Sequence, residues 1–450
     1  MTVGWTSEQV LALSPDAGSA KRGKSLANTA KWVLLGCSEQ AVWGECRGSG
    51  KQPYRTQIDL SEPAFRCSCP SRKFPCKHAL GLLFLWVEQA GAFNQGAPPD
   101  WVAEWLAKRS QTPTQKSAKP KQAAADPVAQ AKRAEKRIAK VEIGLVDLSQ
   151  WLQDILRHGL ATLPNQPYSF WDQTAARLMD AQAPGLARRV RSLASIPHSG
   201  EGWPERMLQA LGQLHLLIQG YGQLASLPPG LQAEVRSQIG WTYSQDELRS
   251  RAAQADPLVA RVKDSWQILG RVLTEEENLR MQRLWLWGET SETTALVLNF
   301  AHGRAPLDLS LVPGSSFTGE LIFYPGTGIQ RAFVESREAT SSQLSQKTTG
   351  FKEMDVAIAS YAQTLSQNPW LEQFPLVLHQ VAPHYQADAW WLQDKAGQVL
   401  PISPHFNQGW ELIALAGGHP LTVFGEWNGV TLLPLSLWHE TQFVALGDGT

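Results

Sequence analysis

The sequence predicts a multidomain α+β protein, and three changes of pattern along its 450 residues indicate this fold class. A short β-meander with cysteines lies near the N-terminus, amphipathic helical segments occupy the middle, and the final part is β-rich. Because a domain holds roughly 100–200 residues, the length favours two to three domains. We expect an N-terminal domain at residues 1–109, a linker at 110–126, a helical region at 127–265 and a β-rich α+β region at 266–450.

The composition indicates a soluble protein without a global charge. Lys plus Arg and Asp plus Glu both total 41, so no overall field draws the chain to nucleic acid or to a membrane. The longest wholly apolar run, residues 79–87, is too short to cross a bilayer, and the N-terminus lacks the pattern of a signal peptide. Three of the five cysteines fall within ten positions, which favours metal binding over a disulfide scaffold. We therefore expect a cytoplasmic protein that does not associate with membranes.

The N-terminal domain is expected to begin with helices and to continue as a meander. Residues 1 to about 35 contain a capping-box pattern at Thr6 and Gln9, and Ser14 followed by Pro15 is typical of a second helix start. Extended segments follow at residues 32–37, 41–46 and 54–60. Cys37 and Cys46 lie in these predicted strands, where we interpret them as small buried hydrophobes.

Residues 110–126 have the composition of a flexible linker. They contain no aromatic residue and no aliphatic residue larger than alanine, and two prolines interrupt them. The tract from Trp101 to Lys140 carries ten Lys or Arg against three Asp or Glu. Such a basic tract could contact phosphates, or it could simply be a solvated linker and the polar face of a helix.

The middle of the chain shows helical periodicity. Asp126 followed by Pro127 predicts a helix start, and the apolar positions of this helix then alternate by three and four: Ile138, Val141, Leu145, Leu148, Leu152 and Ile155. Further helical patterns cover residues 171–180, 185–195, 204–224 and 245–263.

The pattern of the final part is mainly that of strands. Extended segments are expected at residues 266–273, 278–288, 294–301, 307–313 and 319–325 and, after a helix at 351–365, at 389–394, 397–402, 410–417, 421–427 and 429–435. Asn428 and Gly429 predict a hairpin turn between the last two. No repeat typical of a propeller is present.

Cys67, Cys69, Cys76 and His78 form the one constellation with a clear chemical meaning. In a strand, Cys67 and Cys69 would share a face, and the chain would then return Cys76 and His78 from the start of the next helix. Thiolates and an imidazole in so compact a loop suit one tetrahedral zinc ion. Since protein side chains fill all four positions, the zinc is expected to be structural, and we predict no catalytic residue.

Four cations flank these ligands: Arg66, Arg72, Lys73 and Lys77. They could offset the negative charge of three thiolates around a divalent ion. They could equally contact the phosphates of nucleic acid, and the sequence leaves both interpretations open.

The order Cys-x-Cys, spacer, Cys-x-His resembles the SWIM zinc finger at all four ligand positions, over about residues 41–90. The surrounding segments are similar to bacterial SWIM-containing proteins of about this length. The resemblance implies a ββα zinc module that binds DNA or protein, without enzyme activity. It also implies a possible partner role, because such bacterial proteins occur with MoxR-type AAA ATPases and von Willebrand factor A proteins.

Other motifs are absent or incomplete. Residues 44–52 lack the spacing of a phosphate-binding loop and favour a hairpin loop, and the zinc deaminase signature is not matched after Pro75 and Cys76. No small-molecule substrate site is predicted. We expect a zinc-binding protein that acts by binding nucleic acid, protein or both; the alternative is an adaptor for an AAA ATPase and von Willebrand factor A system with a purely structural zinc.

Overall fold

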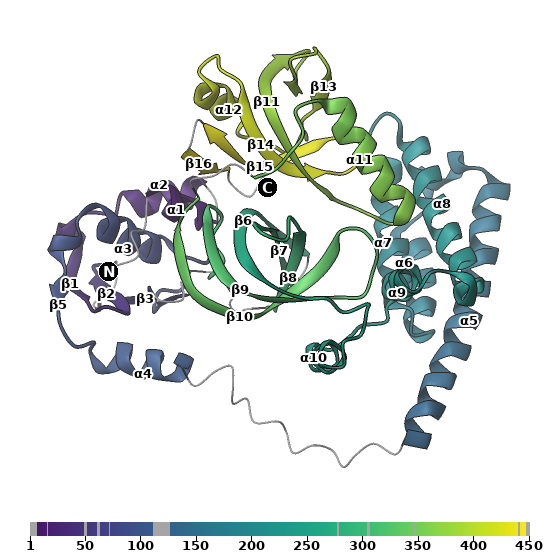
Figure 1. The fold of residues 1–450 in the computed structure, drawn as a ribbon, viewed down its shortest axis with the longest axis horizontal. Helices are drawn as coiled ribbons and strands as arrows, with labels where there is room; N and C mark the ends of the chain where they lie inside the picture. Colours follow the sequence, from purple (N-terminus) through teal and green to yellow (C-terminus); the bar gives the residue numbers. More distant parts are fainter. Residues whose placement is uncertain are drawn as a thin grey trace.

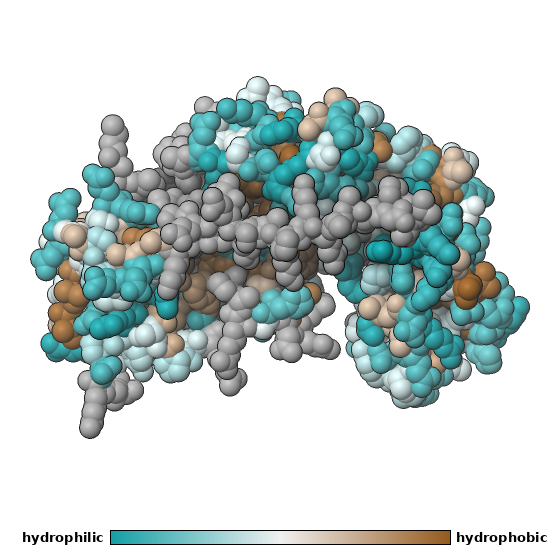
Figure 2. Space-filling model, turned by 90° about the horizontal axis from the view of Figure 1, so that it is seen from below, coloured by the Kyte–Doolittle hydropathy of each residue, from teal (hydrophilic) through white to brown (hydrophobic). Residues whose placement is uncertain are grey.

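The computed structural model describes residues 7–15, 17–48, 52–60, 64–71, 73–110, 127–276, 279–303, 307–344, 348–439 and 442–446. Figure 1 shows the N-terminal domain on one side of a central barrel, a helical bundle on the other side, and a C-terminal sheet above the barrel. In the space-filling view from below, the surface is largely hydrophilic with small hydrophobic patches (Figure 2). Among the described helices, none combines the length and the apolar character that a membrane span needs.

The N-terminal domain folds a five-stranded sheet against one buried helix. Its elements are α1 (Ser7–Ala12), α2 (Ala17–Lys24), β1 (Trp32–Cys37), β2 (Ala41–Cys46), β3 (Tyr54–Asp59), β4 (Ala64–Cys67), α3 (Lys77–Glu88), β5 (Asn94–Gln95) and α4 (Asp100–Ser110). The order is β4-β3-β2-β1-β5, with β5 alone pairing in parallel. The predicted meander is confirmed. The helical start is shorter than expected, because α2 ends at Lys24, whereas the strand predicted at residues 32–37 is confirmed. Thr6 lies outside the described residues.

The helical bundle consists of α5 (Pro127–His158), α6 (Tyr168–Asp180), α7 (Pro184–Ser192), α8 (Trp203–Gly222) and α9 (Pro229–Ile239). The next helix, α10 (Gln245–Ala253), packs on the barrel instead, where Leu248 is buried with Ile322 and Phe333. Five of the six predicted apolar positions of α5 are buried in one core, whereas Ile138 is 43% exposed. The expected linker and Asp126 lie outside the described residues, apart from Ser110 at the end of α4.

The helix expected at residues 245–263 is wrong beyond Ala253. Pro257 restrains the residue before it from the helical conformation, and the Asp256 side chain accepts the backbone N–H of Leu258 instead. A long strand then begins at Arg261, so the change from helix to strand comes earlier than we predicted.

The central barrel contains β6 (Arg261–Glu276), β7 (Leu279–Gly288), β8 (Thr294–His302), β9 (Ser315–Phe323) and β10 (Gln330–Gln343). The first strand, β6, pairs with both β7 and β9, and β8 pairs in parallel with β10, which closes the sheet. This connectivity is that of a five-stranded Greek-key barrel of the OB type.

The strand expected at residues 307–313 is absent. This segment connects β8 to β9 without joining the sheet, and its apolar side chains are divided between two cores: Leu311 is buried in the core of the barrel. Leu309 and Val312 are buried in the core of the N-terminal domain, together with residues of α3. The segment therefore fastens the barrel to the N-terminal domain.

The C-terminal sheet has the order β13-β12-β11-β14-β15-β16. Its elements are α11 (Met354–Gln367), β11 (Phe374–Gln386), β12 (Ala389–Gln393), β13 (Val399–Pro401), α12 (Gly409–Ala416), β14 (Leu421–Trp427), β15 (Leu432–His439) and β16 (Gln442–Ala445). The predicted hairpin at Asn428 and Gly429 is confirmed, with Gly429 at φ 93°. The strand expected at 410–417 is wrong: Leu412 and Ala416 are buried four residues apart, on one face of α12.

Candidate metal centre

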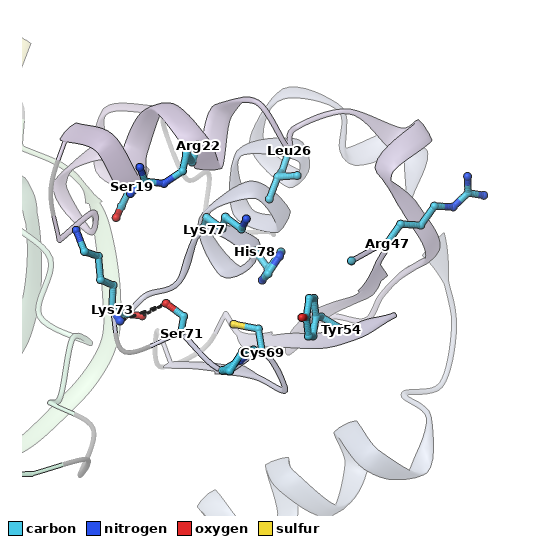
Figure 3. A pocket seen from close by; sticks show the side chains of 12 residues that line it. Ser19, Arg22, Leu26, Arg47, Tyr54, Cys69, Ser71, Lys73, Lys77 and His78 are labelled. Carbon is cyan, nitrogen blue, oxygen red and sulfur yellow. Dashed lines mark hydrogen bonds between the residues drawn. The ribbon is translucent and has the colours of Figure 1, made fainter. Parts of the chain in front are cut away.

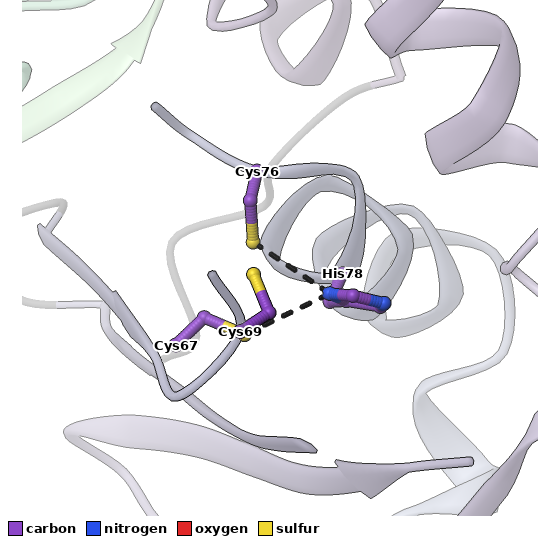
Figure 4. A group of neighbouring side chains, drawn as sticks. All are labelled: Cys67, Cys69, Cys76 and His78. Carbon is purple, nitrogen blue, oxygen red and sulfur yellow. Dashed lines mark hydrogen bonds between the residues drawn. The ribbon is translucent and has the colours of Figure 1, made fainter. Parts of the chain in front are cut away.

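Two elements of the N-terminal domain bring the cysteines and the histidine together. Cys67 ends β4, Cys69 follows it in an irregular turn, Cys76 is the N-cap of α3, and His78 lies in the first turn of that helix (Figure 4). Our expectation that Cys67 and Cys69 share a strand is wrong, because β4 stops at Cys67. The turn nevertheless returns the Cys69 side chain to the same point.

The four ligand atoms lie within 4.8 Å of one another. The Nδ1 atom of His78 is 3.8 Å from the Cys67 sulfur and 4.0 Å from the Cys76 sulfur. Bonds of about 2.3 Å to sulfur and about 2.0 Å to nitrogen would place tetrahedral ligand atoms about 3.5–3.8 Å apart. The donors therefore fit one zinc ion after small shifts, with Nδ1 as the nitrogen that faces the ion.

Neighbouring groups hold these ligands in place. The Thr56 hydroxyl lies 3.2 Å from the Cys67 sulfur, and the Tyr54 ring contacts the His78 ring at a centroid distance of 4.9 Å. The backbone N–H of Ser71 donates to the Cys69 sulfur. Such outer contacts orient metal ligands and adjust their basicity.

The thiols influence one another strongly. Contact with Cys69 raises the pKa of the Cys67 thiol, and contact with Cys67 lowers the pKa of the Cys69 thiol. The reason is that the protonated Cys67 thiol donates a hydrogen bond to the Cys69 thiolate. A divalent cation removes the mutual repulsion that three thiolates would have at this distance. The three cysteines can therefore all be thiolates at once only when a cation is bound between them.

The two remaining cysteines belong to the core. Cys37 and Cys46 are buried free thiols, as predicted, and burial raises the pKa of both. The antiparallel pairing of β2 and β3 also confirms the hairpin expected at residues 44–52, although residues 49–51 lie outside the described part.

A cleft of about 460 Å³ opens beside the metal centre, and we call it the zinc-side cleft (Figure 3). Its lining includes Cys69 and His78 together with four cations: Arg22, Arg47, Lys73 and Lys77. Among the described residues that line it, none is acidic. In Figure 3, Lys73 and Arg22 lie on the side of Ser19, whereas Arg47 lies at the opposite rim with its guanidinium pointing outward.

The four cations that the sequence analysis named, which flank the metal ligands, do not lie together in the structure. Lys73 and Lys77 line the zinc-side cleft. Arg66 is exposed between Phe65 and Cys67, which belong to the buried face of the sheet, so its side chain projects from the other face. Arg72 lies outside the described residues.

Sequence reasoning missed Arg22 and Arg47. Arg22 comes from the last turn of α2 and Arg47 from the end of β2, so only the fold brings them to the metal centre. The basic stretch Lys21 to Lys24 was the one local signal that could have indicated the first of them.

A closed site of three cysteines and one histidine in a small β-rich module defines a zinc finger protein. Comparison with protein families agrees: residues 54–86 match the SWIM zinc finger, and residues 136–239 match the SWIM-associated four-helix bundle domain. The chain is therefore a SWIM-type zinc finger protein, and the second match covers the bundle from α5 to α9. No curated protein and no solved structure gives a significant match.

Proposed function

We propose that this protein acts by binding nucleic acid through the zinc-side cleft, with the zinc in a structural role. The observation that carries the proposal is the cleft lining, in which Arg22, Lys73 and Lys77 are joined by Arg47 at the rim, with no acidic residue among the described lining residues. Phosphate groups are the natural partners of converging cations, and they dominate the affinity of proteins for nucleic acid.

The metal centre supports binding rather than catalysis. Protein side chains supply a full tetrahedral set of ligands, which leaves no coordination position for a water molecule or a substrate. We therefore propose that the zinc fixes β4 to α3 and so positions Lys73 and Lys77 at the cleft. The free thiols and the zinc chemistry suit a reducing compartment, and the cytoplasm remains the location that we propose.

The test is the salt dependence of binding. The full-length zinc-loaded protein is titrated against a labelled oligonucleotide by fluorescence anisotropy between 50 and 200 mM salt. Affinity should fall steeply as salt rises, and Lys77→Ala or Arg47→Ala should each reduce the slope of log K against log salt by about 1. Arg66→Ala is the matched control, since Arg66 is an exposed cation of the same domain on the other sheet face.

Two outcomes would contradict the proposal. The first is no retention of any nucleic acid at 50 mM salt, and the second is an Arg66→Ala effect as large as that of Lys77→Ala. In the first case the adaptor role, with a protein partner such as an AAA ATPase, becomes the better hypothesis, and an affinity pull-down from the native cell would test it.

A further inference from the structure

We propose that the zinc-side cleft selects single-stranded nucleic acid over duplex. This inference rests on the function proposed above and narrows its ligand class. It follows from the burial of α3, the concave arrangement of the cations and the place of Tyr54.

Helix α3 cannot act as a recognition helix for duplex DNA. Every residue from His78 to Leu85 is buried, and the start of the helix is tied to the metal centre through Cys76 and His78. Duplex readout by a zinc finger requires a helix that enters the major groove with exposed side chains. Of the residues of α3, Lys77 at the first position is the one that is both exposed and part of the cleft lining.

The cations surround a hollow instead of forming a flat stripe. They come from α2, the end of β2, the metal-binding loop and the start of α3 (Figure 3). A volume of about 460 Å³ is typical of sites for small ligands, which occupy about 300–1,000 Å³. A duplex is a stiff rod that would lie across the rim of such a hollow, whereas a flexible single strand can place a phosphate and its nucleotide inside.

Tyr54 adds an aromatic surface to the same hollow. Its ring lines the cleft and packs on His78 at an interplanar angle of 36°. Gly48 lines the cleft next to it, and a Cβ atom there would collide with the Tyr54 ring, so the glycine lets the ring pack closely against the backbone at this edge of the cleft. An aromatic side chain beside a basic groove is the combination by which proteins hold single strands without reading their sequence.

The barrel next to the zinc finger has a fold that binds nucleic acid in other proteins, and this comparison is one of fold alone. OB-type barrels bind oligonucleotides and oligosaccharides, although a fold alone does not define a site. The segment with Leu309 and Val312 anchors this barrel in the core of the N-terminal domain.

The experiment compares three labelled ligands of equal length at 50 mM salt: a single DNA strand, its duplex and the corresponding single RNA strand. Binding to the full-length zinc-loaded protein is measured by fluorescence anisotropy. We expect both single strands to bind at least about tenfold more tightly than the duplex. Tyr54→Leu should weaken single-strand binding at least about fivefold and duplex binding much less, while Tyr54→Phe keeps the ring and the affinity.

The outcomes separate this inference from the proposed function. Duplex binding as tight as single-strand binding, with a loss in Lys77→Ala, would overturn the single-strand preference and leave the proposed function standing. No binding of any of the three ligands would overturn both. Zinc content is measured for each Tyr54 variant, and a variant that loses zinc is replaced by Gly48→Ala, whose Cβ atom should displace the Tyr54 ring and so lower single-strand affinity. Zinc content is measured for this variant as well.

Discussion

Arg283 of the barrel and Glu426 of the C-terminal sheet form a bidentate ion pair, with the two N–O distances at 3.0 and 2.8 Å. The indole N–H of Trp285 donates to the same carboxylate at 2.7 Å. Glu426 is 4% exposed and receives three hydrogen bonds, so this junction joins β7 to β14 through one buried charge. The barrel and the C-terminal sheet are therefore coupled in stability.

Replacement of Glu426 should strongly destabilise this junction. Glu426→Ala leaves the Arg283 guanidinium and the Trp285 N–H buried without their acceptor, so we expect a loss of about 3–5 kcal/mol in the free energy of unfolding. Urea denaturation followed by tryptophan fluorescence measures the loss. The control is Glu338→Ala, because the Lys263–Glu338 pair is exposed on both sides and should contribute at most about 1 kcal/mol. Equal losses in the two variants would refute the special role of the buried pair.

Loss of one zinc ligand should unfold the zinc finger. Cys69→Ser removes a thiolate from the donor set, and zinc binding by such modules contributes roughly 10–16 kcal/mol of apparent free energy. We expect the variant to retain less than one zinc per chain by metal analysis and to become sensitive to protease within residues 41–90. Cys37→Ala is the control, since this buried thiol lies outside the cluster and its loss should keep one zinc per chain. Full zinc content in Cys69→Ser would show that the ligand assignment is wrong.

The four ligands could be predicted from the sequence because they lie within twelve positions, and their spacing alone specifies a closed site. The strands at residues 32–37 and 41–46 could also be predicted from the sequence, because a short apolar segment between turn residues is too short for a helix and favours a strand. The cleft could not be predicted from the sequence. Arg22 and Arg47 reach it only because α3 packs between α2 and the sheet, and such contacts have no signature in local sequence.

The wrong strand predictions share a physical cause. An apolar segment shows that side chains are buried but does not show what buries them. Residues 307–313 bury Leu309 and Val312 in the core of another domain, and residues 410–417 bury one face of a helix. Both patterns resemble a strand when the packing partner is unknown.

The Thr56 hydroxyl should tune the affinity for zinc. Thr56 is fully buried and contacts the Cys67 sulfur, so Thr56→Val removes a polar neighbour of the ligand while keeping its shape. We expect zinc affinity to fall by about 10- to 100-fold in a competition titration with a chromophoric chelator. Thr56→Ser retains the hydroxyl and should stay close to the parent. If the valine and serine variants bind zinc equally well, the hydroxyl has no role at the site.

Asp264 should make the stability of the barrel depend on pH in the acidic range. Its carboxylate accepts the backbone N–H groups of Thr290 and Ser291, in the turn that follows β7, and that of its own neighbour Ser265 in β6. Burial acts to raise the pKa of Asp264, but the hydrogen bonds from Ser291 and its neighbours outweigh it, so the pKa lies below its ordinary value. The stabilisation is therefore complete above the pKa of the unfolded chain, about 3.9, and is lost as the pH falls through the lower pKa of the folded protein.

The variant Asp264→Asn tests this dependence. The amide keeps one oxygen acceptor but carries no charge, so we expect a loss of about 1–3 kcal/mol at pH 7. The difference between parent and variant should persist at pH 5 and shrink below about pH 4, because the parent then loses its charge as well. Urea denaturation at several pH values provides the measurement, with Asp246→Asn as an exposed control that should show no such change. A difference that stays constant down to pH 3 would mean that the charge on Asp264 does not stabilise the turn.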